Sequence, residues 1–95
     1  MTARFEWDSR RAASNLRRHG VAFGEATSVF SDPLARIFDD EDHAIEEQRE
    51  IIIGHSTRDR LLLVSFTQRG DTIRIISARK ATRNERKDYE EAVKP

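Results

Sequence analysis

The 95-residue chain contains no cysteine, and this absence excludes disulfide bonds, a thiolate nucleophile and cysteine-ligated zinc. No run of about 18 apolar residues is present, so the sequence predicts no membrane-spanning helix. No apolar segment typical of a signal peptide follows Met1, and no repeat or low-complexity linker interrupts the chain. We therefore expect a single domain over residues 1–95 that acts in the cytoplasm.

The familiar motifs of several enzyme classes are also missing. The chain has no glycine-rich phosphate loop, no GxSxG nucleophile elbow and no HExxH zinc motif. Four acids at residues 39–42 precede His43, and oxygen-rich sets of this kind bind hard metal ions. Contiguous residues rarely converge on one ion, however, and no turn glycine resembling that of an EF-hand is present. We therefore expect neither a metal nor a cofactor.

The formal net charge is zero, with 17 basic and 17 acidic residues, but the charges are unevenly distributed. Residues 1–20 carry five arginines and two acids, and residues 51–83 carry seven basic residues and two acids. Residues 21–50 carry nine acids and two arginines, so this segment is not expected to face a nucleic acid. Most of the basic residues are arginines, whose planar fork suits bidentate contact with phosphate. A phosphate-binding surface is one interpretation of this pattern, and an ordinary mixed-charge surface is the other.

Hydrophobic periodicity predicts two helices, a meander of strands and a final helix. Asp8 is typical of a helix N-cap, Gly20 of a helix C-terminus, and Thr82-Arg83-Asn84-Glu85 of a capping box. The acidic run is predicted to be a loop, and Gln68–Asp71 a tight hairpin connection. The expected fold class is α+β, with a small antiparallel sheet of about four main strands plus a short N-terminal strand. The predicted strands are Phe5–Trp7, Leu34–Phe38, Arg49–His55, Leu61–Thr67 and Thr72–Ala78, and the predicted helices are Ser9–His19, Ala22–Phe30 and one that ends near Val93.

The densest basic stretch lies around the last predicted strand and comprises Arg69, Arg74, Arg79, Lys80 and Arg83. Strand alternation places Arg74 on one face with Lys80, and Arg79 on the other, unless the strand ends or bulges near Ser77–Arg79. An unpaired charge in an apolar strand is costly, so these arginines either pair with acids or face a phosphate. The acids expected near the core edge are Asp8, Glu6 and Glu85.

Motifs along nearly the whole chain, about residues 5–91, are similar to those of one protein family. The matching positions are Phe5-Glu6-Trp7-Asp8, Asn15, Arg18-His19-Gly20-Val21, Phe23, Glu25-Ala26, Val29-Phe30, Asp32-Pro33, His43, Glu47, Arg49, Ile53-Gly54, Arg74-Ile75-Ile76-Ser77-Ala78-Arg79, Ala81, Glu85-Arg86 and Tyr89-Glu90. On these residues the chain resembles BrnT, the toxin of the BrnT/BrnA type II toxin–antitoxin systems. It departs from the family at Arg11 and Arg18, where Lys is frequent, and at Ala22, where a Ser-type helix cap is frequent.

The resemblance implies a RelE-like fold, with helices on one side of an antiparallel sheet and an open basic face on the other. It implies a ribonuclease that arrests translation and is held inactive by a BrnA antitoxin. BrnA is similar to ribbon-helix-helix DNA-binding proteins, so the implied assembly is a heterotetramer that contacts DNA only through the antitoxin.

Metal-independent RNA cleavage needs a base for the 2′-OH, donors for the phosphorane charge and an acid for the departing 5′-oxygen. Arg79 and Arg74 are the expected phosphorane donors. The expected acid or base is His43, whose ordinary pKa is near 6.5, with Tyr89 and Glu47 as alternatives. The residues expected to bind neighbouring RNA phosphates are Arg69, Lys80, Arg83 and Arg49.

Two other functions fit the same residues. The first is a noncatalytic basic module that only binds RNA or a partner protein. The second is a metal-dependent nuclease that uses Asp39, Asp40 and Asp42.

Overall fold

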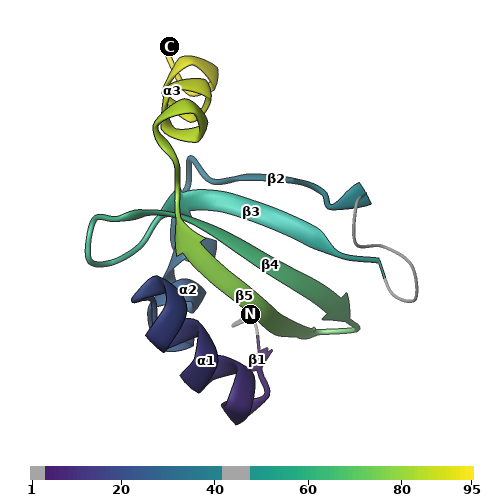
Figure 1. The fold of residues 1–95 in the computed structure, drawn as a ribbon. Helices are drawn as coiled ribbons and strands as arrows, with labels where there is room; N and C mark the ends of the chain where they lie inside the picture. The colour runs from purple at the N-terminus through teal and green to yellow at the C-terminus, as the bar shows by residue number, and fades with distance from the viewer. Residues whose placement is uncertain (1–3, 42–47) are drawn as a thin grey trace.

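A computed structural model describes residues 4–41 and 48–95 of the chain. Its strands form one sheet in the order β1-β5-β4-β3-β2, in which β1 runs parallel to β5 and the other neighbours are antiparallel (Figure 1). The elements in chain order are β1 (Arg4–Glu6), α1 (Ser9–His19), α2 (Phe23–Ser28), the 3-10 turn η1 (Val29–Ser31), β2 (Arg36–Asp39), β3 (Glu50–His55), β4 (Leu61–Arg69), β5 (Thr72–Lys80) and α3 (Arg83–Ala92). The predicted α+β class is confirmed.

Helix α1 has the predicted bounds because both of its ends are capped. The Asp8 carboxylate accepts a hydrogen bond from the backbone N–H of Arg10 at 2.9 Å. Gly20 adopts the left-handed conformation, with φ of 69°, and its N–H donates to the carbonyl of Leu16 at 2.9 Å. Leu16, the largest apolar side chain of α1, is 52% exposed, so apolar burial contributes little to holding this helix.

A buried side chain on α1 attaches this helix to the sheet instead. Asn15 is 3% exposed, and its amide group donates to the carbonyls of Val21 and Ala78 at 2.9 and 2.8 Å. Its carbonyl oxygen accepts from the N–H of Ala78 at 3.0 Å. Asn15 therefore holds both backbone groups of the residue that precedes Arg79.

The second predicted helix is shorter than expected. Its N-cap residue, Ala22, supplies no side-chain hydrogen bond, and the α-helix gives way to a 3-10 turn at Val29. The spacing of this segment predicts that Phe23, Ala26 and Phe30 form its apolar face. Phe23 and Ala26 are buried as predicted, whereas Val29 is buried in place of Phe30, which is only partly buried.

The β4–β5 hairpin confirms the predicted connection and is tighter than the sequence indicated. Arg69 pairs with Thr72, so only Gly70 and Asp71 form the turn, and Gly70 has a φ of 61°. At the other edge of the sheet, Asp39 belongs to β2 and pairs with Glu50. The prediction of a loop throughout residues 39–42 is therefore wrong at Asp39, because strand pairing overrides its low strand preference.

One irregularity in the β4–β5 ladder changes the direction of the side chains along β5. Ser65 of β4 pairs with Ser77 of β5, but the next residue, Phe66, pairs with Ile75. Ile76 of β5 therefore has no partner on β4 and is an extra residue in the ladder. A β-bulge of this kind shifts the alternation of side chains by one residue.

The bulge places Arg74 and Arg79 on the same face of the sheet, since their register partners on β4, Thr67 and Leu63, are an even number of residues apart. Lys80 lies on the other face. The grouping of Arg74 with Lys80 applied only to unbroken alternation, and the bulge beside Ser77 is the exception under which Arg74 and Arg79 share a face.

The two faces of the sheet are covered differently (Figure 1). Helices α1 and α2 cover one face, which we call the helix face. The opposite face, which we call the basic face, carries Arg69, Arg74 and Arg79, and α3 packs on one end of it. The main core, on the helix face, consists of Val21, Phe23, Ala26, Val29, Ile52, Leu62, Val64, Phe66, Ile73, Ile75 and Ala78.

Helix α3 builds a second, smaller apolar cluster on the basic face. Its Tyr89 is 4% exposed and packs with Ile53, Leu61 and Leu63. The expectation of a face left open by all helices is therefore wrong for this end of the sheet. In the described residues, no helix is long and apolar enough to cross a membrane.

Candidate functional site on the basic face

Arg79 is held by Glu85, the capping-box residue of α3. Its Nη1 and Nη2 atoms donate to the two carboxylate oxygens at 2.8 and 2.9 Å, in a bidentate pair. Glu85 also accepts from the backbone N–H of Thr82 at 2.8 Å, and the hydroxyl of Thr82 accepts from the N–H of Glu85 at 3.1 Å. The α3 capping box is thus confirmed, and it aims its carboxylate at Arg79.

The pairing with Arg79 lowers the pKa of Glu85 to about 2, against an opposing contribution from burial and with help from the Thr82 N–H. The same pair raises the pKa of Arg79. Glu85 is therefore ionised at every physiological pH and is a poor proton acceptor.

We expect Glu85→Gln to lower the unfolding free energy by about 1–2 kcal/mol at pH 7. The expected loss is smaller than the pKa shift alone implies, because both side chains of the pair are partly exposed and solvent screens their interaction. The folded pKa of Glu85 is depressed, so its contribution is full above the unfolded pKa of 4.5 and disappears as the pH falls to about 2. Urea denaturation at pH 7, 5 and 3 should show the two proteins converging in acid. A difference that stays constant with pH would contradict the assignment.

Arg79 keeps hydrogen-bonding capacity despite this pair. A guanidinium group has five N–H donors, and Glu85 takes two of those in Arg79 while the carbonyl of Lys80 takes a third at 3.3 Å. The Nε–H and the second Nη2–H, which lie side by side on one edge, have no partner within residues 4–41 and 48–95. Since the Arg79 side chain is 41% exposed, this edge is available to a phosphate.

Arg74 is also paired, but more loosely. Parallel pairing of β1 with β5 places Glu6 beside Arg74, and the ion pair measures 3.5 Å from Nη1 to Oε2. Both side chains are well exposed, at 33% and 44%, so the pair is weak. Both arginines therefore pair with an acid, which was one of the two expectations from the sequence. Both side chains nevertheless remain partly exposed.

Next to Arg74 lies a buried hydroxyl group for which the described residues provide no hydrogen bond. Thr67, its register partner on β4, is 2% exposed, and its Oγ1 has no hydrogen-bond partner in the described parts of the chain. Buried groups of this kind are rare in folded proteins, because each loses its hydration without gaining a hydrogen bond.

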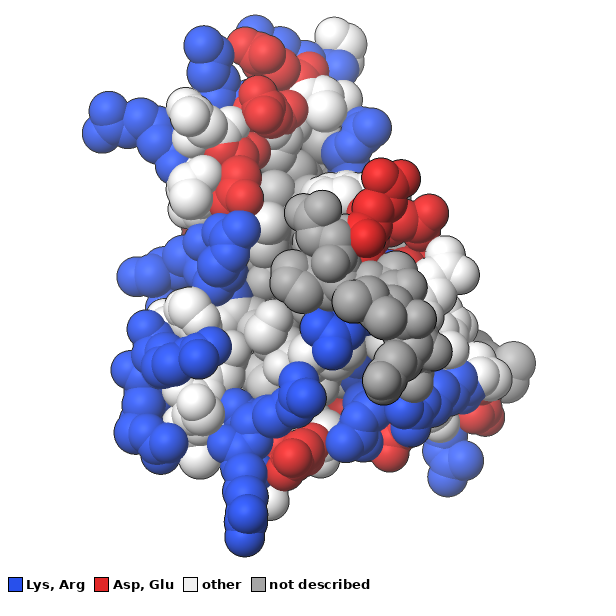
Figure 2. Space-filling model, turned by 45° about the vertical axis from the view of Figure 1, so that its right-hand side comes forward, with Lys and Arg blue, Asp and Glu red and all other residues white. Residues whose placement is uncertain are grey.

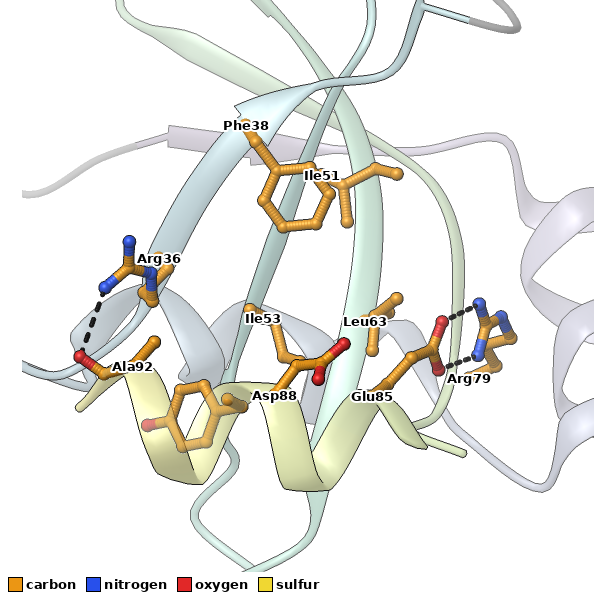
Figure 3. A pocket seen from close by; sticks show the side chains of 10 residues that line it. Arg36, Phe38, Ile51, Ile53, Leu63, Arg79, Glu85, Asp88 and Ala92 are labelled. Carbon is orange, nitrogen blue, oxygen red and sulfur yellow. Dashed lines mark hydrogen bonds and ion pairs between the residues drawn. The ribbon is translucent and has the colours of Figure 1, made fainter. Parts of the chain in front are cut away.

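A hollow of about 360 Å³ lies between α3 and the basic face (Figure 3). Arg36 of β2 and Arg79 of β5 lie at its two ends, and the carboxylates of Glu85 and Asp88 project toward it from α3. The Arg36 guanidinium donates to the carbonyl of Ala92 at 3.5 Å, which joins β2 to the end of α3. The sequence analysis missed this hollow, because its lining comes from five elements that are distant along the chain.

Tyr89 lines the same hollow, but its hydroxyl is directed to another group. It donates to the Asp32 carboxylate at 3.4 Å, and the Asp32 carboxylate also accepts from the backbone N–H of His55 at 2.7 Å. Burial raises the pKa of Tyr89, and the Asp32 charge raises it further. Burial also raises the pKa of Asp32, but the N–H donors of His55 and Leu34 outweigh it, so that pKa is lowered overall.

The sequence analysis gave no site role to His55, the last residue of a predicted strand, or to Asp32. The structure groups both with Tyr89, and the His55 and Tyr89 rings meet edge to face with centroids 5.6 Å apart. No local sequence signal predicts this contact, since 57 residues separate Asp32 from Tyr89.

The other expected site residues are placed around this centre. Arg69 and Arg83 are exposed, at the end of β4 and the start of α3, and Arg49 is half-buried just before β3. Lys80 is exposed but belongs to the helix-face side of β5. His43 and Glu47 lie outside the described residues.

Within residues 4–41 and 48–95, no group of three or more His, Cys, Asp or Glu side chains is arranged to hold a metal ion. Asp42, one of the three acids considered for a metal site, lies outside this range.

Figure 2 shows one side of the molecule, where basic side chains spread over the left and lower parts and acidic ones gather mostly above and to the right.

The described fold is the fold of a ribonuclease toxin of known structure. The crystal structure of the Brucella abortus ribonuclease toxin BrnT superimposes with a TM-score of 0.66, covering 86% of this chain and all of that one, at 24% sequence identity. A comparison with curated proteins gives no match.

The family assignment rests on the sequence. Residues 7–85 match the family described as the ribonuclease toxin, BrnT, of type II toxin–antitoxin systems. The chain belongs to this family, which confirms the resemblance seen in its motifs. Membership of a type II system implies an antitoxin as partner.

Proposed function

We propose that this protein is an endoribonuclease that inhibits translation by cleaving RNA without a metal ion. The observation that carries the proposal is the bulge at Ile76, which brings Arg74 and Arg79 to one exposed face with unused N–H donors. Fixed guanidinium groups of this kind stabilise the charge that develops on phosphate oxygens during phosphoryl transfer.

In the proposed reaction, the ribose 2′-oxygen forms a bond to the adjacent phosphorus while the bond from phosphorus to the 5′-oxygen breaks. The 2′-OH proton passes to a base, and an acid protonates the departing 5′-oxygen. The products are a 2′,3′-cyclic phosphate and a 5′-OH, so no water or metal enters the step.

Arg79 and Arg74 hold the phosphorane oxygens in this scheme. Arg79 contacts them through its free Nε–Nη2 edge, while Glu85 fixes the adjacent Nη1–Nη2 edge of the guanidinium group. Preorganisation of this kind matters because a donor that is already oriented loses little freedom when the charge develops.

The proposed acid and base are Tyr89 and His43. The phenol of Tyr89 is protonated at neutral pH and therefore serves as a proton donor, although its raised pKa makes it a weaker acid. To act, its hydroxyl has to exchange the Asp32 carboxylate for the departing 5′-oxygen. His43 is the proposed base, since imidazole titrates near neutral pH. The phosphates on either side of the scissile one contact Arg69, Arg83 and Arg49. Lys80 lies on the helix face, so an RNA strand reaches it only by passing around the end of β5.

The proposed antitoxin is a BrnA-like ribbon-helix-helix protein. It neutralises the toxin in a heterotetramer and supplies the only contact of the complex with DNA. Because the basic face is the proposed RNA site, we infer that the antitoxin covers it. We place both proteins in the cytoplasm, where the free toxin acts on cellular RNA.

The test is cleavage of RNA by the purified protein in excess chelator. We expect cleavage to persist, with 2′,3′-cyclic phosphate and 5′-OH ends identified by mass spectrometry. RNA that is bound at equimolar protein but stays intact would support the noncatalytic alternative. Activity that disappears with chelator and is lost in Asp39→Asn would support the metal-dependent one.

A further inference from the structure

The hollow beside Arg79 is more apolar than a phosphate site requires. Its floor is formed by Ile51 of β3, Ile53 of β3 and Leu63 of β4, and Phe38 of β2 closes one side. Phe38 is 48% exposed. An exposed aromatic ring beside a concave apolar surface is typical of a ligand site, and the volume of the hollow lies within the range of small-molecule pockets.

The polar groups at the rim are few and differ in availability. Both oxygens of Glu85 are already bonded to Arg79, as described above. Asp88, one turn further along α3, projects toward the hollow and forms no hydrogen bond or ion pair with the rest of the described chain (Figure 3). Asp88 therefore offers two unused acceptor oxygens above an apolar floor.

We propose that the hollow is a specificity pocket for a guanine base of the RNA, next to the phosphate held by Arg79. This inference rests on the proposed ribonuclease function and names its substrate preference. An apolar floor and an aromatic side chain fit the flat surface of a base, and a neighbouring arginine fits the phosphate of the same nucleotide.

The choice of guanine follows from the hydrogen-bonding groups. Guanine presents two N–H donors side by side, at N1 and N2, and a carboxylate accepts both in a bidentate arrangement. Adenine, cytosine and uracil each place an acceptor next to their donor on this edge, and an acceptor facing Asp88 is repelled. The geometry thus favours guanine over the other three bases.

The pocket is tested directly with the four nucleoside 3′-monophosphates. We expect guanosine 3′-monophosphate to shift the backbone NMR signals of Phe38, Ile51 and Asp88, with an affinity about tenfold above that of the others. Equal affinities, or shifts that avoid these residues, would overturn the pocket. Nucleotide binding tests the pocket separately from catalysis. If the protein bound guanosine 3′-monophosphate as expected but cleaved no RNA, only the proposed ribonuclease function would be overturned.

Variants then connect the pocket with cleavage. In Asp88→Asn the amide offers one donor and one acceptor, so we expect the preference for guanine at sequenced cleavage sites to fall about tenfold. Phe38→Leu, which keeps an apolar side chain, should weaken binding of all four nucleotides. Glu90→Gln changes an exposed acid outside the hollow and is the matched control. A cleavage pattern unchanged in Asp88→Asn, or changed equally in Glu90→Gln, would contradict the proposal.

Discussion

Arg79→Ala is expected to lower the rate of RNA cleavage by about 10²–10³-fold and to relieve growth arrest when the toxin is expressed. On the basic face as described, the guanidinium group of Arg79 is both fixed by a bidentate carboxylate and partly exposed. Its loss removes a preoriented donor from the developing phosphorane charge. Cleavage of a defined RNA at saturating substrate measures the effect.

The same substitution leaves Glu85 without its partner, so loss of activity must be separated from loss of fold. Arg79→Ala combined with Glu85→Gln removes both charges of the pair and should fold while remaining inactive. Arg58→Ala removes an arginine that is 71% exposed in the β3–β4 loop and should keep full activity. If the folded double variant still cleaved RNA at the wild-type rate, Arg79 would have no role in the reaction.

Asn15→Ala is expected to have the largest effect on stability, about 3 kcal/mol. The substitution leaves the carbonyls of Val21 and Ala78 and the N–H of Ala78 buried without partners. A loss of this size is a large fraction of the 5–15 kcal/mol that stabilises a typical domain. Equilibrium urea denaturation measures it.

The neighbouring residue provides the control for Asn15. Leu16→Ala removes a larger apolar side chain that is 52% exposed, and we expect it to cost less than about 1 kcal/mol. If the two variants were equally stable, α1 would be held by something other than the Asn15 hydrogen bonds.

The elements that the sequence predicted well are those set by local signals. Asp8 and Gly20 cap α1, and Thr82 and Glu85 cap the start of α3, so these boundaries agree with the structure to within a residue. The start of β5 and the hairpin turn follow from Gly70, whose positive φ fits the two-residue connection.

The features that the sequence did not predict depend on pairing between distant segments. The bulge at Ile76 exists only in relation to the register of β4, so the common face of Arg74 and Arg79 remained conditional until the ladder was known. The hollow under α3 likewise needs β2, β3 and α3 to meet. Glu85 was recognised as a possible partner of Arg79, but its second role as a helix cap explains why the pair is so well oriented.

The most direct test of the account is to map where RNA binds, using a short oligonucleotide whose 2′-deoxy position blocks cleavage. We predict that NMR shifts fall on Ser65, Ser77 and Arg79, along the strands that form the basic face. Shifts confined to α1 and α2, or no binding at all, would contradict the claim that arginines gathered by the β5 bulge receive the scissile phosphate.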